Sequence, residues 1–191
     1  EIVHCPVTDF EACGDAIQWV ENNVGPIDIL VNNAGITKDG MFKKMPRENW
    51  DAVIDTDLNS VFNMTRQVFE GMVERGFGRI INVSSVNGQL GQIGQVNYSA
   101  AKAGVHGFTK ALARETARKG VTVNTISPGY VATPMVMAID EEVRKMIESN
   151  IPTGRLCQPE EVAHGVSFLA SDLAAYTTGS DLSMNGGLFM H

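Results

Sequence analysis

A tyrosine and a lysine lie four residues apart in the segment "VNYSAAKAG" (96–104), among alanines and a glycine. If this segment forms a helix, Tyr98 and Lys102 project from one face, one turn apart. A free phenol has a pKa of about 10 and exchanges protons poorly at neutral pH. An adjacent ammonium favours the phenolate. We therefore expect Lys102 to lower the pKa of Tyr98 and make it a general acid for a carbonyl oxygen that receives a hydride.

Such a carbonyl oxygen needs a second hydrogen-bonding group beside the acid. Ser85 ends the apolar run "RIINVSS" upstream of Tyr98, and a hydroxyl at the end of a strand could serve. A tyrosine and a lysine at this spacing are, by themselves, most often an ordinary pair on an exposed helix face. Their combination with Ser85 and with other polar strand ends favours a catalytic function.

The chain alternates short apolar runs with longer amphipathic stretches, and these elements must position the three side chains. We predict strands at 1–7, 27–33, 78–85, 121–129 and 179–187. We predict helices at 10–25, 46–75, 97–119, 135–149 and 159–171, the first capped by Thr8 or Asp9. Strands rich in valine and isoleucine that alternate with helices predict a single α/β domain over 1–191, with a parallel sheet and helices on both faces.

Polar or glycine-rich segments follow three of the predicted strands. They are "NNAG" (32–35), "SS" (84–85) and "SPGYVAT" (127–133). In open parallel sheets, ligands bind at the carboxyl ends of the strands. Each segment alone could be a simple tight turn, but three of them on one edge predict a binding site there.

Composition and charge exclude several classes of function. The 191 residues are 43% hydrophobic and 19% charged, and the formal net charge of −7 is spread along the chain. We therefore expect neither nucleic acid nor a membrane surface as a partner. No apolar run approaches the roughly 20 residues that span a bilayer, and no signal peptide is visible. The three cysteines fit neither a disulfide framework nor a metal site, so we expect structural thiols in a cytoplasmic protein.

Several motifs occur in a characteristic order. "NNAG" (32–35), "NVSS" (82–85), "YSAAK" (98–102), "SPGYVAT" (127–133) and the closing "NGG" (185–187) resemble those of the short-chain dehydrogenase/reductase family. The resemblance covers essentially the whole chain. It implies a Rossmann-like doubly wound parallel sheet and hydride transfer from a nicotinamide cofactor, NADP (NADPH) rather than NAD. Within the family, the sequence is most similar to reductases of short 3-oxoacyl-CoA thioesters.

The resemblance implies a role for each residue at a matching position. Tyr98 would protonate the ketone, Ser85 would orient it, and Lys102 would also hold the nicotinamide ribose. The cofactor would be lined by these groups and by Asn32, Ala34, Gly35, Pro128, Gly129, Val131 and Thr133. The acyl-CoA would contact Ser85, Asp39, Gln92, Gln95 and Tyr130.

The largest departure from the family pattern is at the start. The first strand, the glycine-rich turn that holds the pyrophosphate and the strand that chooses between NAD and NADP have no counterpart. We therefore expect a sheet that lacks its first βαβ portion and a sequence that is a fragment of a longer protein. Pro6 replaces a side chain that meets the adenine, so that contact would depend on the backbone of Val7.

Asp57 is the other departure. It stands in "DTDLNS", where the family usually has an asparagine that completes a catalytic tetrad. We expect Asp57 to pair with Lys102, raise the lysine pKa and alter its effect on Tyr98. The substitution would have no effect if only the backbone at this position matters.

The activity implied by the resemblance is reduction of a 3-oxoacyl-CoA to the (R)-3-hydroxyacyl-CoA, as in the synthesis of polyhydroxybutyrate precursors. One alternative is the same reaction on an acyl-carrier-protein thioester. Gly76 stands where those reductases commonly have a basic residue, but Arg118 and Lys119 could meet an acidic carrier. A second alternative is a dinucleotide-fold scaffold without activity, which the intact serine, tyrosine and lysine argue against.

Two predicted helices carry small or apolar faces. The faces comprise Val61, Met64 and Val68 in 46–75, and Ala103, Gly107 and Ala111 in 97–119. In relatives these helices and the segment "NGGLFMH" form subunit interfaces, so the resemblance implies a homotetramer. Packing within one chain is the alternative explanation of these faces.

Overall fold

The computed structural model describes residues 1–190, apart from the side chain of Met135. Four parallel strands form one sheet in the order β1 (Ile29–Asn32), β2 (Gly78–Val83), β3 (Val121–Pro128) and β4 (Asp181–Met184). The register pairs Leu30 with Ile80, Ile80 with Val123, and Ile126 with Leu182. The two central strands are almost wholly buried, as their continuous apolar runs predict.

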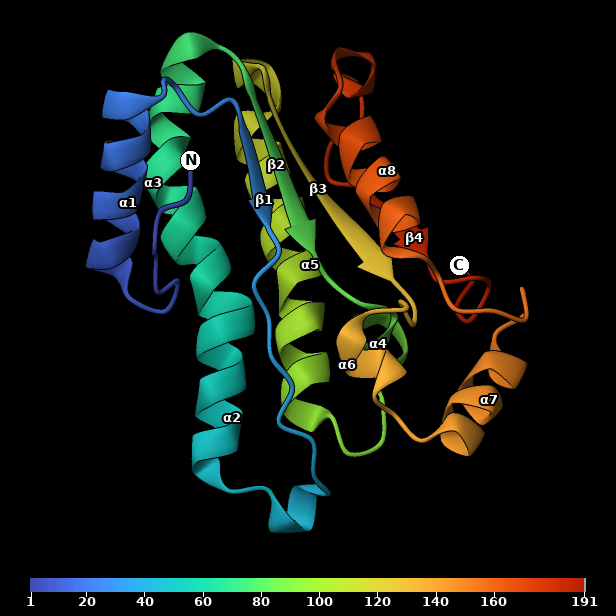
Figure 1. Ribbon diagram of the computed structural model, residues 1–191. Coiled ribbons are helices and arrows are strands. Elements are labelled where there is room, and N and C mark those ends of the chain that lie inside the picture. The colour runs from blue at the N-terminus through green and yellow to red at the C-terminus, as the bar shows by residue number, and fades with distance from the viewer. Residues whose placement is uncertain (191) are drawn as a thin grey trace.

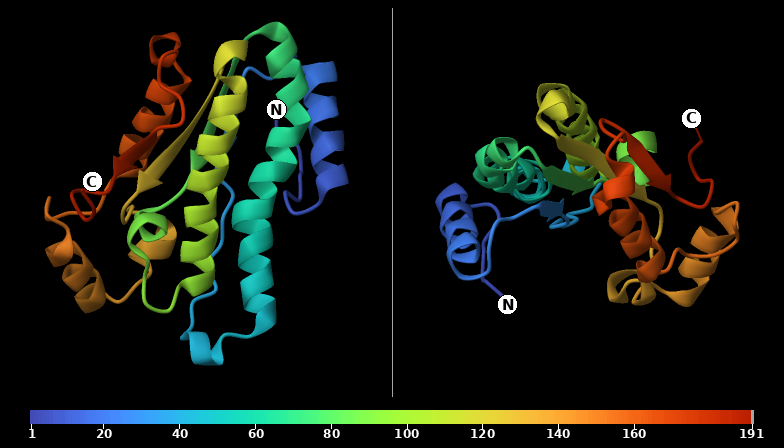
Figure 2. Two further views of the ribbon diagram at one scale, coloured as in Figure 1. Left: turned by 180° about the vertical axis from the view of Figure 1, so that it is seen from behind. Right: turned by 90° about the horizontal axis from the view of Figure 1, so that it is seen from above.

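Helices cover both faces of the sheet, as predicted. The helices α3 (Ser60–Arg75) and α5 (Val96–Thr116) lie on one face and α8 (Pro159–Ala170) on the other (Figures 1 and 2). The helix α1 (Phe10–Asn23) packs against α3, and Asp9 caps it by accepting hydrogen bonds from the amides of Glu11 and Ala12. The structure thus confirms the α/β fold class with a Rossmann-like parallel sheet.

Two apolar clusters hold these layers together. The larger lies between the sheet and the helices α1, α3 and α5, and comprises Ile17, Leu30, Val68, Met72, Ile80, Ala113, Val121 and Val123. The smaller lies under α8 and comprises Ile81, Ile126 and Leu169. Gly165 lets α8 approach the sheet, because a Cβ there would lie 2.5 Å from Met184 Sδ and 2.8 Å from Ile126 Cδ1.

The predicted strand at 1–7 is wrong. Residues 1–6 have no regular structure, because no strand lies beside them to complete a hydrogen-bonded ladder. The carbonyl of Val7 instead accepts hydrogen bonds from Asn63 Nδ2 (3.0 Å) and Cys13 Sγ (3.6 Å).

The predicted helix 46–75 forms with an interruption. It consists of α2 (Arg47–Ile54), a π-helical turn η2 (Asp55–Asn59) and α3. Such turns widen a helix by one residue and are frequent at functional sites. The predicted helix 135–149 is two helices, α6 (Pro134–Met137) and α7 (Glu141–Asn150), because the Asp140 side chain accepts hydrogen bonds from two amides and begins a new helix.

The remaining elements are short. They are α4 (Val86–Leu90), which the sequence analysis missed, and the 3₁₀ turns η1 (Phe42–Lys44), η3 (Ala117–Lys119) and η4 (Asp172–Ala174). Within residues 1–190, none of the helices combines the length and apolar character that crossing a bilayer requires.

Candidate active site

The carboxyl ends of the strands meet at one edge of the sheet, where a cavity of about 520 Å³ opens. Figure 1 shows β1, β2 and β3 ending side by side, with α4 and α6 beside these ends. Segments after β2 and β3 and the start of α5 line the cavity, as the prediction from the polar strand ends requires. The predicted residues that line it are Asp39, Ser85, Gln92, Gln95, Tyr98, Pro128, Gly129, Tyr130, Val131 and Thr133.

Two hydroxyl groups converge in this cavity. Ser85 follows β2 in an extended conformation and caps α4, where its Oγ accepts a hydrogen bond from the amide of Asn87 at 3.1 Å. Tyr98 projects from the first turn of α5 and lines the same cavity, where its phenol interacts with Ser85. A carbonyl oxygen placed beside this pair can therefore receive two hydrogen bonds.

Lys102 lies one turn further along α5 and is almost fully buried behind Tyr98. Its Nζ donates a hydrogen bond to the carbonyl of Val83 at 3.0 Å and lies 5.6 Å from the centre of the Tyr98 ring. The Nζ also lies 3.6 Å from Asp57 Oδ2. The predicted spacing of Tyr98 and Lys102 on one helix face is thus present, with Asp57 below it.

Asp57 is fully buried in the π-helical turn η2. Its Oδ1 accepts a hydrogen bond from the amide of Ile36 at 2.8 Å, and Oδ2 has no hydrogen bond. Burial raises the pKa of Asp57, and the positive charge of Lys102 opposes this shift. Burial lowers the pKa of Lys102, and Asp57 opposes that shift in turn. Pairing with Asp57 therefore raises the lysine pKa as expected, but burial has the larger effect.

The predicted lowering of the Tyr98 pKa by Lys102 is wrong. Burial raises the pKa of Tyr98, the hydrogen bond from Ser85 opposes this, and the charges of Asp57 and Asp39 raise it further. The ammonium is directed to the carbonyl of Val83, and the carboxylate of Asp57 offsets its charge. The environment therefore keeps the phenol protonated, which is the form that an acid needs.

Polar side chains at one side of the cavity form a short network. Gln95 Nε2 donates to Asp39 Oδ2 at 2.9 Å, and Gln95 Oε1 accepts from Asn87 Nδ2 at 2.9 Å. The amide of Gly40 donates to the carbonyl of Gly94 at 2.8 Å, which joins the two loops. This arrangement brings together the predicted thioester contacts at Asp39 and Gln95.

The segment after β3 lines another part of the cavity. Pro128, Val131 and Thr133 present two apolar surfaces and a hydroxyl. Gly129 leaves the backbone bare, because a Cβ there would lie 2.9 Å from the Cα of Asn185. A flat ring with a polar amide fits such a lining.

Gly35, close after β1, lies beside the buried pair of Asp57 and Lys102 rather than on the cavity wall. A Cβ at Gly35 would lie 3.2 Å from Asp57 Oδ2 and 3.3 Å from Lys102 Nζ, so a side chain there would crowd the two charged groups. Ala34 is exposed.

Two predicted cofactor contacts have other partners. The side chain of Asn32 donates hydrogen bonds to Thr65 Oγ1 at 3.1 Å and Asn82 Oδ1 at 2.8 Å inside the fold. Val7 lies outside the cavity, in the turn before α1.

Several residues of the cavity were not predicted from the sequence. They are Thr37, Val83, Ser84, Asn87, Ile93, Val136, Ile139 and Ile147. The position of Asn87, two residues after Ser85, could have indicated that it lines the cavity. The apolar residues of α6 and α7 gave no local signal, because only the path of the chain after β3 brings them to the site.

Comparison with known proteins gives consistent similarities. A family model described as enoyl-(acyl carrier protein) reductase matches residues 1–189. An acetoacetyl-CoA reductase from Allochromatium vinosum is 62% identical over 97% of this chain and 75% of its own length. The nodulation protein G of Azospirillum brasilense is 60% identical over 95% of this chain and 74% of its own length. A 3-oxoacyl-[acyl-carrier-protein] reductase from Vibrio harveyi is 49% identical over 96% of this chain and 75% of its own length.

Proposed function

This chain belongs to the short-chain dehydrogenase/reductase family of oxidoreductases, and from that premise we propose that it reduces acetoacetyl-CoA to (R)-3-hydroxybutyryl-CoA with NADPH. The observation that carries the proposal is the convergence of Ser85 and Tyr98 in one cavity with Lys102 buried behind them. The high identity to an acetoacetyl-CoA reductase supports the choice of substrate. Such a product would serve the synthesis of polyhydroxybutyrate precursors in the cytoplasm.

The reaction needs the cofactor and two hydroxyl groups of this chain. A nicotinamide cofactor, when bound, would supply the hydride for the carbonyl carbon. Ser85 donates a hydrogen bond to the ketone oxygen and orients it, and Tyr98 gives that oxygen its phenolic proton. Because the two side chains line the same cavity and interact, they can hold the same oxygen with little rearrangement.

Lys102 and Asp57 would return a proton to Tyr98 after each turnover. Burial raises the pKa of Asp57 and lowers that of Lys102, so the two groups compete more evenly for a proton than they would in water. Their 3.6 Å separation is close enough for the pair to act together. We therefore assign Asp57 to the catalytic machinery, in place of the usual asparagine.

The cofactor would be held by the segment after β3 and by residues near β1 and the turn before α1. Thr133, Pro128, Gly129 and Val131 would meet the nicotinamide, and Lys102 its ribose. The backbones of Asn32, Ala34, Gly35 and Val7 would contribute from β1 and the turn before α1. The choice of NADPH over NADH follows from the family resemblance alone.

The chain would work as a homotetramer. A groove of about 270 Å³ between α3 and α5 is lined by Phe62, Phe69, Phe108 and Leu112 among other residues. On α3 the predicted face is wrong, because Val61 and Val68 are buried within this chain and Met64 packs against its core. Phe62 is instead 52% exposed, and Ala103, Gly107 and Ala111 leave the neighbouring surface of α5 open. A second copy that covers this face would bury these side chains.

The alternative substrate, an acyl-carrier-protein thioester, is favoured by the relative from Vibrio harveyi. Arg118 and Lys119 lie in η3, beyond the C-terminal end of α5, whereas Tyr98 lies at its beginning (Figure 1). A helix of this length separates them by about 30 Å at 1.5 Å per residue. These two residues are therefore too far from the cavity to dock a carrier at its mouth.

The deciding experiment follows NADPH absorbance with acetoacetyl-CoA, using the full-length protein and its Tyr98→Phe variant. We expect rapid oxidation of NADPH that falls by about 10²-fold or more in the variant, because the acid is lost. An acetoacetyl-acyl-carrier-protein substrate is the matched comparison. Turnover of the carrier thioester alone would overturn the CoA assignment, and cofactor binding without reduction of either substrate would overturn the proposed activity.

A further inference from the structure

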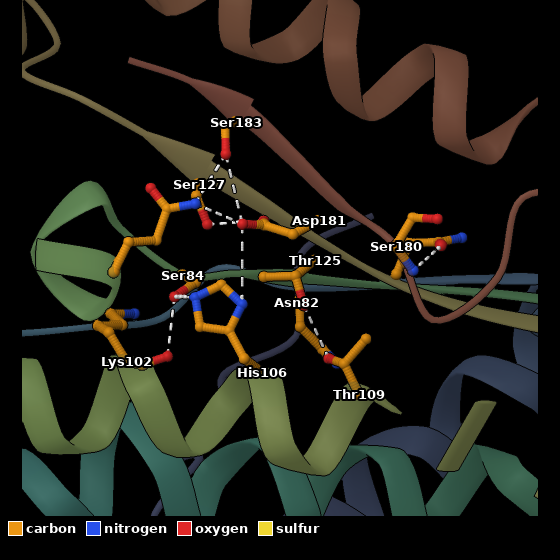
Figure 3. Close-up of polar contacts among 12 residues, drawn as sticks. Asn82, Ser84, Lys102, His106, Thr109, Thr125, Ser127, Ser180, Asp181 and Ser183 are labelled. Atoms are coloured by element: carbon orange, nitrogen blue, oxygen red, sulfur yellow. Dashed lines mark hydrogen bonds and ion pairs between the residues drawn. The ribbon is translucent and has the colours of Figure 1, made fainter. Parts of the chain in front are cut away.

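A second polar cluster, largely buried, adjoins the cavity at Ser84, and the proposed mechanism does not use it. It connects Ser84 after β2, His106 on α5 and Asp181 on β4 (Figure 3). His106 Nε2 lies 3.0 Å from Ser84 Oγ, and His106 Nδ1 lies 3.8 Å from Asp181 Oδ2. Neither His106 nor Asp181 lines the cavity, so any effect on the reaction must pass through other residues.

Ser84 is the point where this cluster meets the catalytic groups. It lies between Val83, whose carbonyl accepts from Lys102 Nζ, and Ser85. Its own Oγ donates to the backbone carbonyl of Lys102 at 2.8 Å. Residues 83 and 84 therefore hold both the ammonium and the backbone of Lys102, which fixes α5 against the turn that carries Ser85.

The hydrogen bonds of Ser84 determine what His106 must supply. A hydroxyl group has a single hydrogen, and Ser84 gives it to the carbonyl of Lys102. His106 Nε2 must then be the donor of the 3.0 Å contact. The histidine thus holds the Ser84 hydroxyl in the orientation that binds α5.

Asp181 is in turn held from several elements, as Figure 3 shows. Its carboxylate accepts hydrogen bonds from Gln89 Nε2 of α4 (2.6 Å) and from Ser127 Oγ of β3 (2.7 Å). Ser183 of β4 donates to it at 3.4 Å. The carboxylate faces Nδ1 of His106, with which it forms an ion pair only when the imidazole is protonated. When the imidazole is protonated, this ion pair holds the ring with Nε2 directed at Ser84.

We propose that His106 and Asp181 are positioning residues for the reduction, and that they act through Ser84. They fix the turn that carries Ser85 against the part of α5 that carries Tyr98 and Lys102. This inference rests on the proposed function for its kinetic consequence, whereas its structural consequence is independent of any activity. Loss of the His106 contact loosens the Ser85 turn, and small displacements of catalytic groups reduce turnover strongly.

The test compares His106→Phe with His106→Gln in the full-length enzyme. Phenylalanine fills a similar volume but removes both ring nitrogens. Glutamine retains an Nε2 donor for Ser84, so it serves as the conservative rescue. His164→Phe on the exposed surface of α8 is the matched control, because it changes a histidine in the same way far from the cavity.

We expect His106→Phe to lower kcat for acetoacetyl-CoA about tenfold and to change KM less than about twofold, because the substrate contacts stay intact. His106→Gln should recover kcat to within about threefold of the wild-type value. Amide hydrogen exchange of peptide 84–91 should be faster in His106→Phe and unchanged in the His164 variant.

Three results would overturn the proposal. They are an unchanged kcat in His106→Phe, no recovery in His106→Gln, and exchange that accelerates throughout the molecule or not at all in peptide 84–91. If the wild-type protein does not reduce acetoacetyl-CoA, the proposed function fails by itself. The exchange comparison then decides whether His106 positions the turn.

Discussion

At the scale of single residues, the site depends on which charges are buried beside Tyr98. Burial and the negative charge of Asp57 raise the pKa of this phenol, and Lys102 is paired with the same aspartate. Reduction uses the phenolic proton of Tyr98, so a raised pKa keeps Tyr98 in its protonated form across neutral pH. The raised pKa also makes Tyr98 a weaker acid, because such a phenol gives up its proton less readily.

The pH dependence of reduction tests this arrangement. We expect kcat to stay level through neutral pH and to fall only in the alkaline range, as the phenol ionises above its ordinary pKa. In Asp57→Asn, the negative charge that raises the Tyr98 pKa is lost, so the decrease of kcat at alkaline pH should begin at lower pH. Asp55→Asn, an exposed carboxylate on the same turn, should leave the profile unchanged. A shift to higher pH, or equal shifts in both variants, would contradict the assignment.

At the scale of elements, close approach of helices to the sheet positions the strand ends. Gly165 brings α8 onto β3 and β4, where a side chain would meet Met184 and Ile126. Gly88 does the same for α4 and α5, because a Cβ there would lie 2.8 Å from the backbone carbonyl carbon of Lys102. The catalytic turn thus depends on small residues that the chemistry does not use.

Gly165→Ala tests this packing. We expect the variant to lower the free energy of unfolding by about 1–3 kcal/mol, because the added methyl group overfills the interface between α8 and the sheet. Gly14→Ala in α1 is the matched control, because its Cβ would meet only the end of the flexible Gln67 side chain at 3.3 Å. Denaturant unfolding of both variants gives the comparison. Equal free energies of unfolding for the two variants would show that α8 accommodates the added methyl group without loss of stability.

At the scale of the whole molecule, the exposed face of α3 and α5 is the feature that a single chain does not explain. Phe62 stacks on Phe10 with ring centres 6.1 Å apart, yet remains half exposed. The helices of this face also carry the catalytic groups, Tyr98 and Lys102 on α5 and Asp57 just before α3. Association through this face would therefore restrain the elements that form the site.

Phe62→Arg tests the proposed association. We expect this variant to reduce the molar mass of the assembly in sedimentation or light scattering, because a buried, unpaired guanidinium opposes docking. Val24→Arg, an equally exposed position beyond the end of α1, is the control and should keep the wild-type mass. An unchanged mass in Phe62→Arg would remove this face as the interface.

Local patterns in the sequence were enough to predict the main elements. Buried runs such as "GRIINV" and the amphipathic spacing of residues 159–170 identify strands and helices because their periodicity reflects burial directly. Capping residues also located the start of α1. The predicted strand at 1–7 is wrong because a strand needs a neighbouring strand. The predicted helix at 135–149 is interrupted because one side chain, that of Asp140, caps a new helix.

The sequence by itself determined the chemistry available to this protein. The order of its polar strand ends and the spacing of Tyr98 and Lys102 follow from chain geometry within a strand or a helix. Only the tertiary structure decided how these groups are tuned. Burial set the direction of the Tyr98 pKa, the π-helical turn placed Asp57 beneath Lys102, and pairing of β4 with β3 brought Asp181 to His106. Desolvation and contacts between distant segments exist only after the chain has folded.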